Sequence, residues 1–373
     1  GIGKSTLLSQ AASAIGWAGG KVLYAHGEES GAQVKLRWQR LGLPMDQVHV
    51  LDSCRLDVVQ DALQDLVPRI LIIDSVQTLV DPALESPPGS IQQAKFGAFA
   101  LAETCRELGT ALCLVAHVTK EGVIAGPKVL EHMVDTVLYF EQAEGSIRFL
   151  RAQKNRFGAT DELGFFRMED SGLREVRNAA EVFLEDRKGD IPPGICMSPV
   201  LEGSRSFLVE LQALVVSGKQ GFSRIFSEKI DQRRLSRIAA ILEKHGRLKL
   251  GDQDLYVHIA GGIRIVDPGL DLGLAMALHS ARTGLSLPAG WAIAGELSLA
   301  GEVRNSGNLK KRIQAAIDAG CPGIVGPRNV DIDSPAYHGV RTVAEAVRAV
   351  FGSMESGRKD EERDPVPDHA AQA

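Results

Sequence analysis

The feature that most constrains this chain is its first six residues, Gly1-Ile2-Gly3-Lys4-Ser5-Thr6. They match the second half of the phosphate-binding loop G-x-x-x-x-G-K-[ST], whose glycines let backbone N–H groups approach phosphate oxygens. In such a loop Lys4 would reach the β- and γ-phosphates of a nucleotide, and the Ser5 hydroxyl would bind Mg²⁺. The alternative is a chance match in a glycine-rich loop. The motif predicts a nucleotide site at the start of a helix.

The first glycine of that loop and the strand that feeds it would lie before residue 1, and the chain has no initiator Met. We therefore expect an N-terminal truncation. We also expect weaker nucleotide binding by this chain than by a version extended upstream.

Alternating helix and strand patterns run through residues 1–178 and predict a mostly parallel sheet covered on both faces. Apolar runs suggest strands at 22–25, 48–51, 69–74 and 111–116, with further strands at 136–141, 147–153 and 163–168. Helical patterns occupy 5–16, 31–41, 56–66 and 91–108. The expected fold class is therefore α/β, with a phosphate-binding loop before the first helix.

A charged, proline- and glycine-rich stretch separates this part from a second α/β domain. We assign 1–178 to the first domain, 179–194 to a linker and 195–352 to the second domain, with a disordered tail at 353–373. In the second domain we expect strands near 206–216 and 256–260. Helices are expected near 232–245, 270–282, 309–319 and 343–351.

Composition excludes several classes of protein. Hydrophobic residues make up 44% and charged residues 24% of the 373 residues, which is typical of globular domains rather than disordered or collagen-like chains. No apolar run is long enough to span a membrane. The five cysteines form no C-x-x-C pair, so we expect no zinc site within this chain and a reducing, cytoplasmic location.

Three polar residues follow predicted strands and are candidate catalytic groups. Asp74 ends a fully apolar strand, where a carboxylate could hold Mg²⁺; the alternative is an acid that caps a turn. Glu28 could polarise an attacking water, or belong to a helix start. His117 could sense the γ-phosphate, or be an ordinary histidine at a strand end.

Two polar segments could couple the nucleotide to partners. The loop at 119–131 contains Lys120 and Lys128, so it suits contact with a polymer such as DNA, although a plain surface loop is the alternative. Lys154-Asn155-Arg156-Phe157-Gly158 offers two cations that could reach a nucleotide in a neighbouring subunit. Here the alternative, a solvated basic turn, is favoured by the residues alone.

The segment 219–250 is basic although the whole chain carries a net charge of −5. Its nine Lys or Arg and three acids leave a net charge of +6. Arg233, Arg234 and Arg237 lie close along a predicted helix and are candidate contacts to DNA phosphates. The alternative is a solvated helix face whose charge a neighbouring element balances.

Taken together, these motifs resemble the bacterial RadA (Sms) family of DNA repair and recombination ATPases. The resemblance rests on K-N-R-F-G at 154–158, on H-V-T-K-E-G-V-I-A-G-P-K-V-L-E-H-M-V-D-T-V-L-Y-F at 117–140, and on G-D-Q-D-L-Y-V-H-I-A-G-G at 251–262. It implies a RecA-like ATPase core followed by a Lon-protease-like domain. It further implies a hexameric ring, binding of single-stranded and branched DNA, a possible RecA-type recombinase partner, and an upstream four-cysteine zinc finger.

Carried over by position, the resemblance makes Gly1 to Thr6 the ATP-binding loop and Asp74 the metal-holding acid. It makes Glu28 the water-activating residue and residues 154–158 the signature required beyond simple DNA binding. Lon enzymes use a serine and a lysine. Here Asp271 appears at the expected serine position and Lys310 at the lysine segment, which predicts a salt bridge rather than an activated nucleophile.

The sequence therefore predicts an ATP-driven DNA motor that promotes branch migration during recombination, with a Lon-like domain that does not cleave peptides. Two alternatives stay open at this stage. One is an ATP-dependent Lon-type peptidase, which the missing serine disfavours. The other is a RecA-like regulatory ATPase without a DNA role, which the basic segment disfavours.

Overall fold

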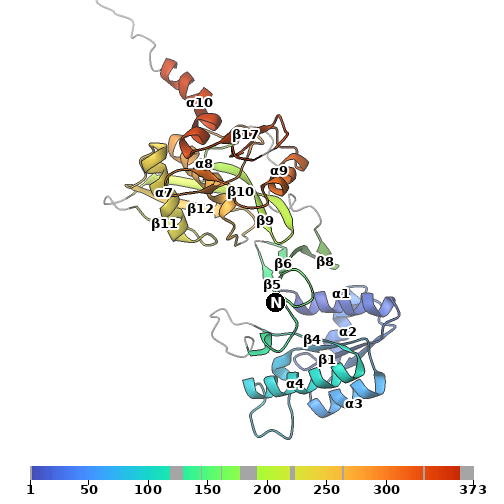
Figure 1. The fold of residues 1–373 in the computed structure, drawn as a ribbon. Helices are drawn as coiled ribbons and strands as arrows, with labels where there is room; N and C mark the ends of the chain where they lie inside the picture. The colour runs from blue at the N-terminus through green and yellow to red at the C-terminus, as the bar shows by residue number, and fades with distance from the viewer. Residues whose placement is uncertain are drawn as a thin grey trace, which may run out of the picture. The chain divides into compact units, whose positions relative to one another are not determined.

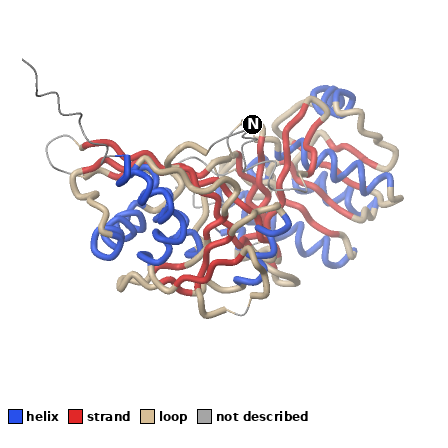
Figure 2. Tube along the Cα trace, turned by 90° about the horizontal axis from the view of Figure 1, so that it is seen from above, coloured by secondary structure: helices blue, strands red, loops and turns tan. Residues whose placement is uncertain are grey.

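A computed structural model describes residues 2–117, 129–143, 145–160, 162–176, 191–218, 223–262, 264–330 and 332–361, with side chains described as far as residue 352. The chain divides into two compact units, Gly1–Glu175 and Val176–Ala373. Figures 1 and 2 show that each unit gathers its strands into sheets with helices beside them. Among the described residues, no helix combines the length and the apolar character needed to cross a membrane.

The first unit contains a four-stranded parallel sheet in the order β2-β1-β3-β4. Its strands are β1 (Val22–His26), β2 (Val48–Leu51), β3 (Ile70–Asp74) and β4 (Ala111–Leu114). Its helices are α1 (Lys4–Trp17), α2 (Gly31–Arg40), α3 (Leu56–Leu66) and α4 (Ile91–Leu108), with the short 3₁₀ helix η1 (Val76–Thr78). The predicted parallel sheet and all four predicted helices are confirmed.

Helices cover both faces of this sheet because its central strands are apolar on both sides. Alternate residues of β1 enter two different cores. Leu23 and Ala25 pack with the buried residues of α3 and α4. Val22 and Tyr24 pack with Ala12 of α1 and with buried residues of α2. The carboxyl ends of β1, β3 and β4 consequently meet at one edge of the sheet.

The later strands of this unit form a separate antiparallel sheet in the order β5-β6-β7-β8. They are β5 (Thr136–Gln142), β6 (Ile147–Asn155), β7 (Leu163–Glu169) and β8 (Gly172–Glu175). Three of the four had been predicted as strands, but not their separation from the parallel sheet. Short hairpin links allow only antiparallel neighbours, whereas a parallel pair needs a long crossover.

The second unit is built on a seven-stranded sheet in the order β11-β12-β10-β9-β13-β16-β17. Its strands are β9 (Ile195–Glu202), β10 (Arg205–Ser217), β11 (Ile225–Phe226), β12 (Gln253–Ile259), β13 (Ala292–Ile293), β16 (Ile324–Pro327) and β17 (Tyr337–Val340), and β14 (Glu296–Leu297) pairs separately with β15 (Val303–Arg304). Its helices are α7 (Gln232–Gly246), η3 (Pro268–Leu270), α8 (Asp271–Thr283), α9 (Leu309–Asp318) and α10 (Val343–Glu361).

Helix α8 is the central helix of this unit. Every residue from Asp271 to Ser280 is buried, which is typical of a helix surrounded by other elements. The four helices expected in this domain are present. Helix α10 continues to Glu361 and so enters the segment from 353 onward that we expected to be disordered.

Candidate nucleotide site and basic face

The described part of the phosphate-binding loop leads directly into α1. Gly3 has a φ of 103°, a left-handed conformation that a residue with a Cβ rarely adopts. Lys4 begins α1, so Ser5 and Thr6 occupy its first turn, where backbone N–H groups are free to bind an anion. Gly1 lies outside the described residues, and the Ile2 carbonyl accepts a hydrogen bond from Arg148.

The predicted catalytic residues come together at the carboxyl edge of the parallel sheet. The Lys4 ammonium donates to the Ala116 carbonyl at 2.8 Å and lies 3.0 Å from Nδ1 of His117. The other ring nitrogen of His117 is 3.6 Å from a carboxylate oxygen of Glu28. Burial lowers the pKa of Lys4, although Asp74 and Glu28 oppose that shift, so both acids lie within electrostatic reach of the ammonium.

Glu28 is held by a neighbour rather than used to begin a helix. The Ser75 hydroxyl, which is fully buried, donates to the Glu28 carboxylate. The helix that follows is capped by Ser30, whose side chain accepts from the Gln33 backbone N–H in a reciprocal capping box. The helix-start interpretation therefore does not account for Glu28. In the part of the chain that the structure describes, no backbone N–H donates to its carboxylate, which lies beside His117.

Asp74 makes a contact that the sequence analysis missed. The Tyr24 hydroxyl donates to Oδ2 of Asp74 at 2.6 Å, and both side chains are buried. Among the described residues no backbone N–H donates to the Asp74 carboxylate, so the turn-capping alternative is not observed. Tyr24 lies two residues before the partner of Asp74 in the β1–β3 register, and only the pairing of the two strands brings these side chains together.

The oxygen-rich composition of this edge fits Mg²⁺. Carboxylate and hydroxyl oxygens such as those of Asp74 and Ser5 are the hard ligands that Mg²⁺ prefers. No cluster of three or more His, Cys, Asp or Glu that could hold a metal occurs in the part of the chain that the structure describes. Bound Mg²⁺ would therefore take several of its ligands from nucleotide phosphates and water.

The K-N-R-F-G segment lies at the end of β6. The Lys154 ammonium donates to the carbonyls of Glu131 and Val134, so it is held by its own subunit. Arg156 forms an ion pair with Asp135 at 3.0 Å, and both side chains are more than half exposed. Phe157 is 84% exposed. Asn155 organises the turn by donating to the Ala159 carbonyl and accepting from the Phe157 N–H, which brings it next to Gly158.

The two lysines of the predicted coupling loop, Lys120 and Lys128, lie outside the described residues. Their role in DNA contact stays a prediction.

A buried carboxylate binds some of the arginines on the basic face of α7. Asp271 has a fully buried side chain and pairs with Arg234 at 2.7 Å and with Arg237 at 3.1 Å. Arg234 also donates to the carbonyls of Val266 and Asp267 and is only 11% exposed. Two of the three predicted DNA contacts thus have an internal partner, as the alternative of a balanced helix face requires.

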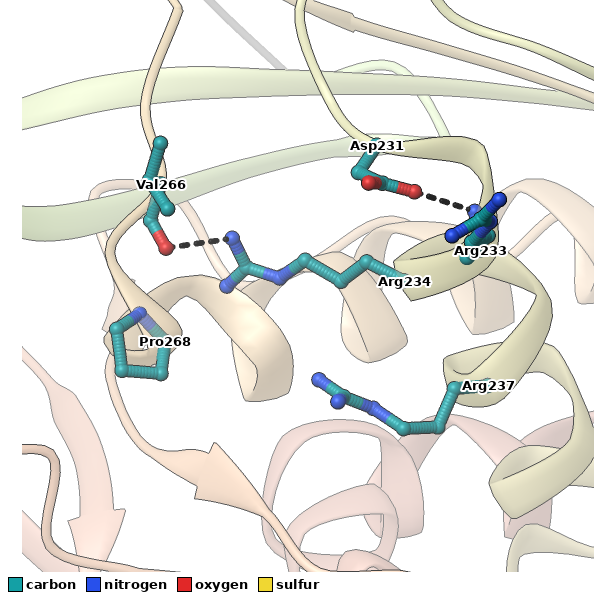
Figure 3. A pocket seen from close by; sticks show the side chains of 6 residues that line it. All are labelled: Asp231, Arg233, Arg234, Arg237, Val266 and Pro268. Atoms are coloured by element: carbon teal, nitrogen blue, oxygen red, sulfur yellow. Dashed lines mark hydrogen bonds between the residues drawn. The ribbon is translucent and has the colours of Figure 1, made fainter.

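The three arginines line a surface pocket of about 330 Å³ together with Asp231, Val266 and Pro268 (Figure 3). Arg233 is exposed, and only its backbone N–H contacts Asp231. Lys244 near the end of α7 and Arg247, the residue that caps its C-terminus, are also exposed. Within the described residues, the side chains of Arg233, Lys244 and Arg247 have no hydrogen-bond or ion-pair partner. These cations of α7 and its C-cap remain available to an anionic partner.

The predicted salt bridge between Asp271 and Lys310 is wrong. Lys310 is exposed on α9, while Asp271 binds the two arginines of α7. The error has a physical cause: Asp271 is fully enclosed and takes the cations nearest to it, which the distant segment α7 supplies.

A second buried ion pair, which the sequence analysis missed, lies beside η3. Arg312 is 2% exposed and binds both carboxylate oxygens of Asp267. A Cβ at Gly269 would lie 2.7 Å from the Arg312 guanidinium and from the Ser306 hydroxyl. The guanidinium thus fills the space in front of Gly269, and its charge is already satisfied by Asp267.

Two family models match the chain. Residues 1–123 match a model described as an AAA domain. Residues 223–337 match the C-terminal proteolytic domain of Lon protease (S16). The first match covers the loop, Glu28, Asp74 and His117, and the second covers α7, α8 and α9. The chain therefore has the expected combination of an ATPase-type core and a Lon-type domain.

Curated relatives match over nearly the whole chain. The DNA repair protein RadA of Treponema pallidum is 45% identical over 359 residues, which cover 95% of this chain and 78% of that protein. The protein of the same name from Halalkalibacterium halodurans is 40% identical and that from Bacillus subtilis 39% identical, each over 94% of this chain and 78% of the relative.

Proposed function

Because this chain belongs to the RadA family of DNA repair proteins, and is accordingly an ATPase, we propose that it acts in DNA repair and recombination as an ATP-driven motor on DNA. In this proposal it binds single-stranded and branched DNA, assembles as a homo-oligomeric ring and promotes branch migration. The observation that carries the proposal is the convergence of Lys4, Glu28 and His117 at the sheet edge that also holds Asp74.

Each residue of this edge has a distinct task in the proposed mechanism. Bound ATP with Mg²⁺ supplies the phosphoryl group and a cation that neutralises its oxygens. With the nucleotide bound, Lys4 would turn from the Ala116 carbonyl toward the phosphates, and Ser5 and Asp74 would hold the metal. Glu28, held by Ser75, orients the attacking water and accepts its proton. His117, in contact with both Lys4 and Glu28, reports phosphate binding to the loop that follows.

The test of the motor proposal is DNA-stimulated ATP turnover combined with branch migration of a synthetic three-strand junction. Lys4→Ala and Glu28→Gln should each reduce turnover by at least about 100-fold, the usual cost of removing one group that stabilises a transition state. DNA binding should persist in Glu28→Gln. If the wild-type protein hydrolyses ATP at a rate that DNA does not change, the alternative of a regulatory ATPase replaces the motor.

The exposed cations of α7 and its C-cap are proposed to contact DNA phosphates. Neutralising Arg233, Lys244 and Arg247 together with glutamine should weaken binding to single-stranded DNA. The log–log salt slope should flatten by about 2, since each phosphate contact contributes about 0.7 on single strands. A variant with Lys310→Gln and Lys311→Gln, on the exposed side of α9, is the matched control. An unchanged slope with intact oligomers would exclude this face as a DNA site.

The Lon-type domain is proposed to act as a scaffold without peptidase activity. Support comes from the start of α8, where Asp271 stands at the expected serine position and its buried carboxylate is paired with Arg234 and Arg237, so that it offers no hydroxyl nucleophile. Casein incubated with the protein and ATP should remain intact on a gel. Cleavage that persists after inhibition of contaminating proteases would favour the peptidase alternative.

A further inference from the structure

Tyr24 is the one buried phenol that contacts the proposed metal-holding acid within the described residues. Its side chain is 1% exposed, and its hydroxyl donates to Oδ2 of Asp74 at 2.6 Å. The ring packs edge-on against Trp38 of α2, with ring centroids 6.5 Å apart. Trp38 is fully buried. The phenol oxygen therefore occupies a defined position that the packing of β1 against α2 determines.

The Tyr24 hydroxyl donates a short hydrogen bond to the Asp74 carboxylate. A hydroxyl that donates to a carboxylate makes a charge-assisted hydrogen bond, which is shorter and stronger than a neutral one. Burial, followed by the charge of Asp74 and the hydrogen bond to it, raises the pKa of Tyr24 far above its usual range.

The hydrogen bond from Tyr24 makes the two carboxylate oxygens of Asp74 different from each other. Oδ2 accepts from Tyr24, whereas Oδ1 has no hydrogen-bond partner among the described residues. A carboxylate that is held at one oxygen loses the broad rotation of its terminal torsion, so the other oxygen points in one direction. Asp74 ends β3 and lies within electrostatic reach of Lys4, so its carboxylate belongs to the proposed nucleotide edge of the sheet.

We propose that Tyr24 is a positioning residue that orients the Asp74 carboxylate for Mg²⁺ binding. The inference rests on the proposed metal-holding role of Asp74, and it adds a second layer of residues behind the metal. Trp38 supports the ring and Tyr24 holds Oδ2, which leaves Oδ1 for the metal or for a water bound to it. Such supporting partners commonly tune metal affinity as strongly as the ligands themselves.

The test is the Mg²⁺ dependence of binding to a fluorescent ATP analogue, measured for wild-type protein and for Tyr24→Phe. Phenylalanine keeps the ring and its packing and removes only the hydroxyl. The Mg²⁺ concentration for half-maximal binding should rise about tenfold, because hydrogen bonds to charged groups are worth about 1.4 kcal/mol or more. The affinity for the analogue at saturating Mg²⁺ should stay within about twofold of the wild-type value. A general loosening of the fold would weaken this affinity as well as raise the Mg²⁺ requirement.

The matched control is Tyr139→Phe. Tyr139 also donates its hydroxyl to a carboxylate, that of Glu131, at 2.7 Å in the same unit, yet it lies outside the nucleotide edge. Its Mg²⁺ dependence should equal that of the wild-type protein. Thermal melts followed by circular dichroism verify that both variants are folded at the assay temperature.

Asp74→Asn separates the two levels of the inference. If Asp74→Asn abolishes the Mg²⁺ dependence and Tyr24→Phe leaves the half-maximal concentration unchanged, the positioning role of Tyr24 is wrong while the role of Asp74 stands. If Asp74→Asn itself leaves the Mg²⁺ dependence unchanged, the metal-holding assignment fails and the inference about Tyr24 fails with it.

Discussion

At the residue scale, the second unit depends on charges that are buried in pairs. Asp271 and Asp267 have side chains that are almost or fully excluded from solvent, and each is bound by arginine. An isolated buried carboxylate would cost several kcal/mol, so each acid requires its cation for the domain to fold. The basic character of α7 therefore has a structural component that its sequence does not reveal.

Removal of Arg234 should expose this dependence. Arg234→Gln leaves the half-exposed Arg237 as the one cation bound to Asp271 among the described residues, and we expect a loss of about 3–5 kcal/mol in the free energy of unfolding. Urea denaturation followed by circular dichroism measures the change. Arg233→Gln, on the same helix without a side-chain partner, should stay within about 0.5 kcal/mol of the wild type.

A double variant distinguishes an unpaired charge from lost packing. Arg234→Gln combined with Asp271→Asn should regain part of the lost stability, since the charge that needed compensation is gone. The opposite outcome is that the double variant loses as much free energy of unfolding as the two single variants together, or more. In that case the contribution of Arg234 comes from packing rather than from charge compensation.

At the scale of single elements, helix α2 determines where Glu28 can lie. Ser30 caps the helix in a reciprocal box with Gln33, and only three residues, 27–29, separate this cap from the end of β1. Because Ser30 satisfies the first helical N–H groups, the preceding carboxylates need not do so. Glu29 pairs with Arg37, and Glu28 turns to Ser75 and His117.

Loss of this cap should affect catalysis as well as stability. Ser30→Ala should lower the free energy of unfolding by about 1 kcal/mol, the usual cost of removing an N-cap. It should also lower ATP turnover several-fold, because the loop that carries Glu28 loses its anchor. Ser90 caps α4 in the same way, by accepting from the Gln93 N–H, but lies outside the catalytic edge.

Ser90→Ala is therefore the control for the cap prediction. It should cost similar stability and leave turnover near the wild-type level. Equal turnover in the two variants would mean that the position of Glu28 does not depend on the start of α2.

At the scale of the whole molecule, the proposed ring requires one subunit to act on the nucleotide of another. The turn after β6 offers two cations of different availability. Lys154 is held by two backbone carbonyls of its own subunit, whereas Arg156 forms an exposed pair with Asp135. An exposed ion pair is worth at most about 1 kcal/mol, so Arg156 can leave it at little cost.

We therefore expect Arg156 to be the cation that acts in trans. Arg156→Ala should lose DNA-stimulated turnover while it keeps DNA binding. Mixing it with Lys4→Ala protein should restore part of the activity, because some mixed sites combine an intact loop with an intact Arg156. Turnover measured across mixing ratios tests this expectation, and Asp135→Ala, which frees Arg156, is the control that should keep activity.

The absence of rescue at every ratio, with subunit exchange verified by fluorescence, would assign Arg156 a role within its own subunit. Rescue by Lys154→Ala but not by Arg156→Ala would transfer the trans role to Lys154.

Local signals in the sequence were sufficient to predict that Lys4, Asp74 and His117 meet at one edge of the parallel sheet. The carboxyl ends of neighbouring parallel strands lie at one edge of the sheet, so residues that follow these strands converge there. The glycine-rich loop with Lys4, the apolar strand that ends in Asp74 and the polar residues after the two neighbouring strands are all visible in the sequence. The helices of both units could be predicted for the same reason, since their apolar periodicity and capping residues are properties of short segments. The division of the early strands into one parallel and one antiparallel sheet was not predictable in this way, because it depends on which strands pair.

Only the tertiary structure decided the partners of buried polar groups. Tyr24 meets Asp74 because β1 pairs with β3 in one register, and a shift by one residue would turn the phenol to the other face. Asp271 takes its cations from α7 rather than from Lys310, and Arg312 finds Asp267 across 45 positions of sequence. A buried charge requires a partner, but which partner it obtains depends on the packing of distant segments, and residue spacing carries no information about that.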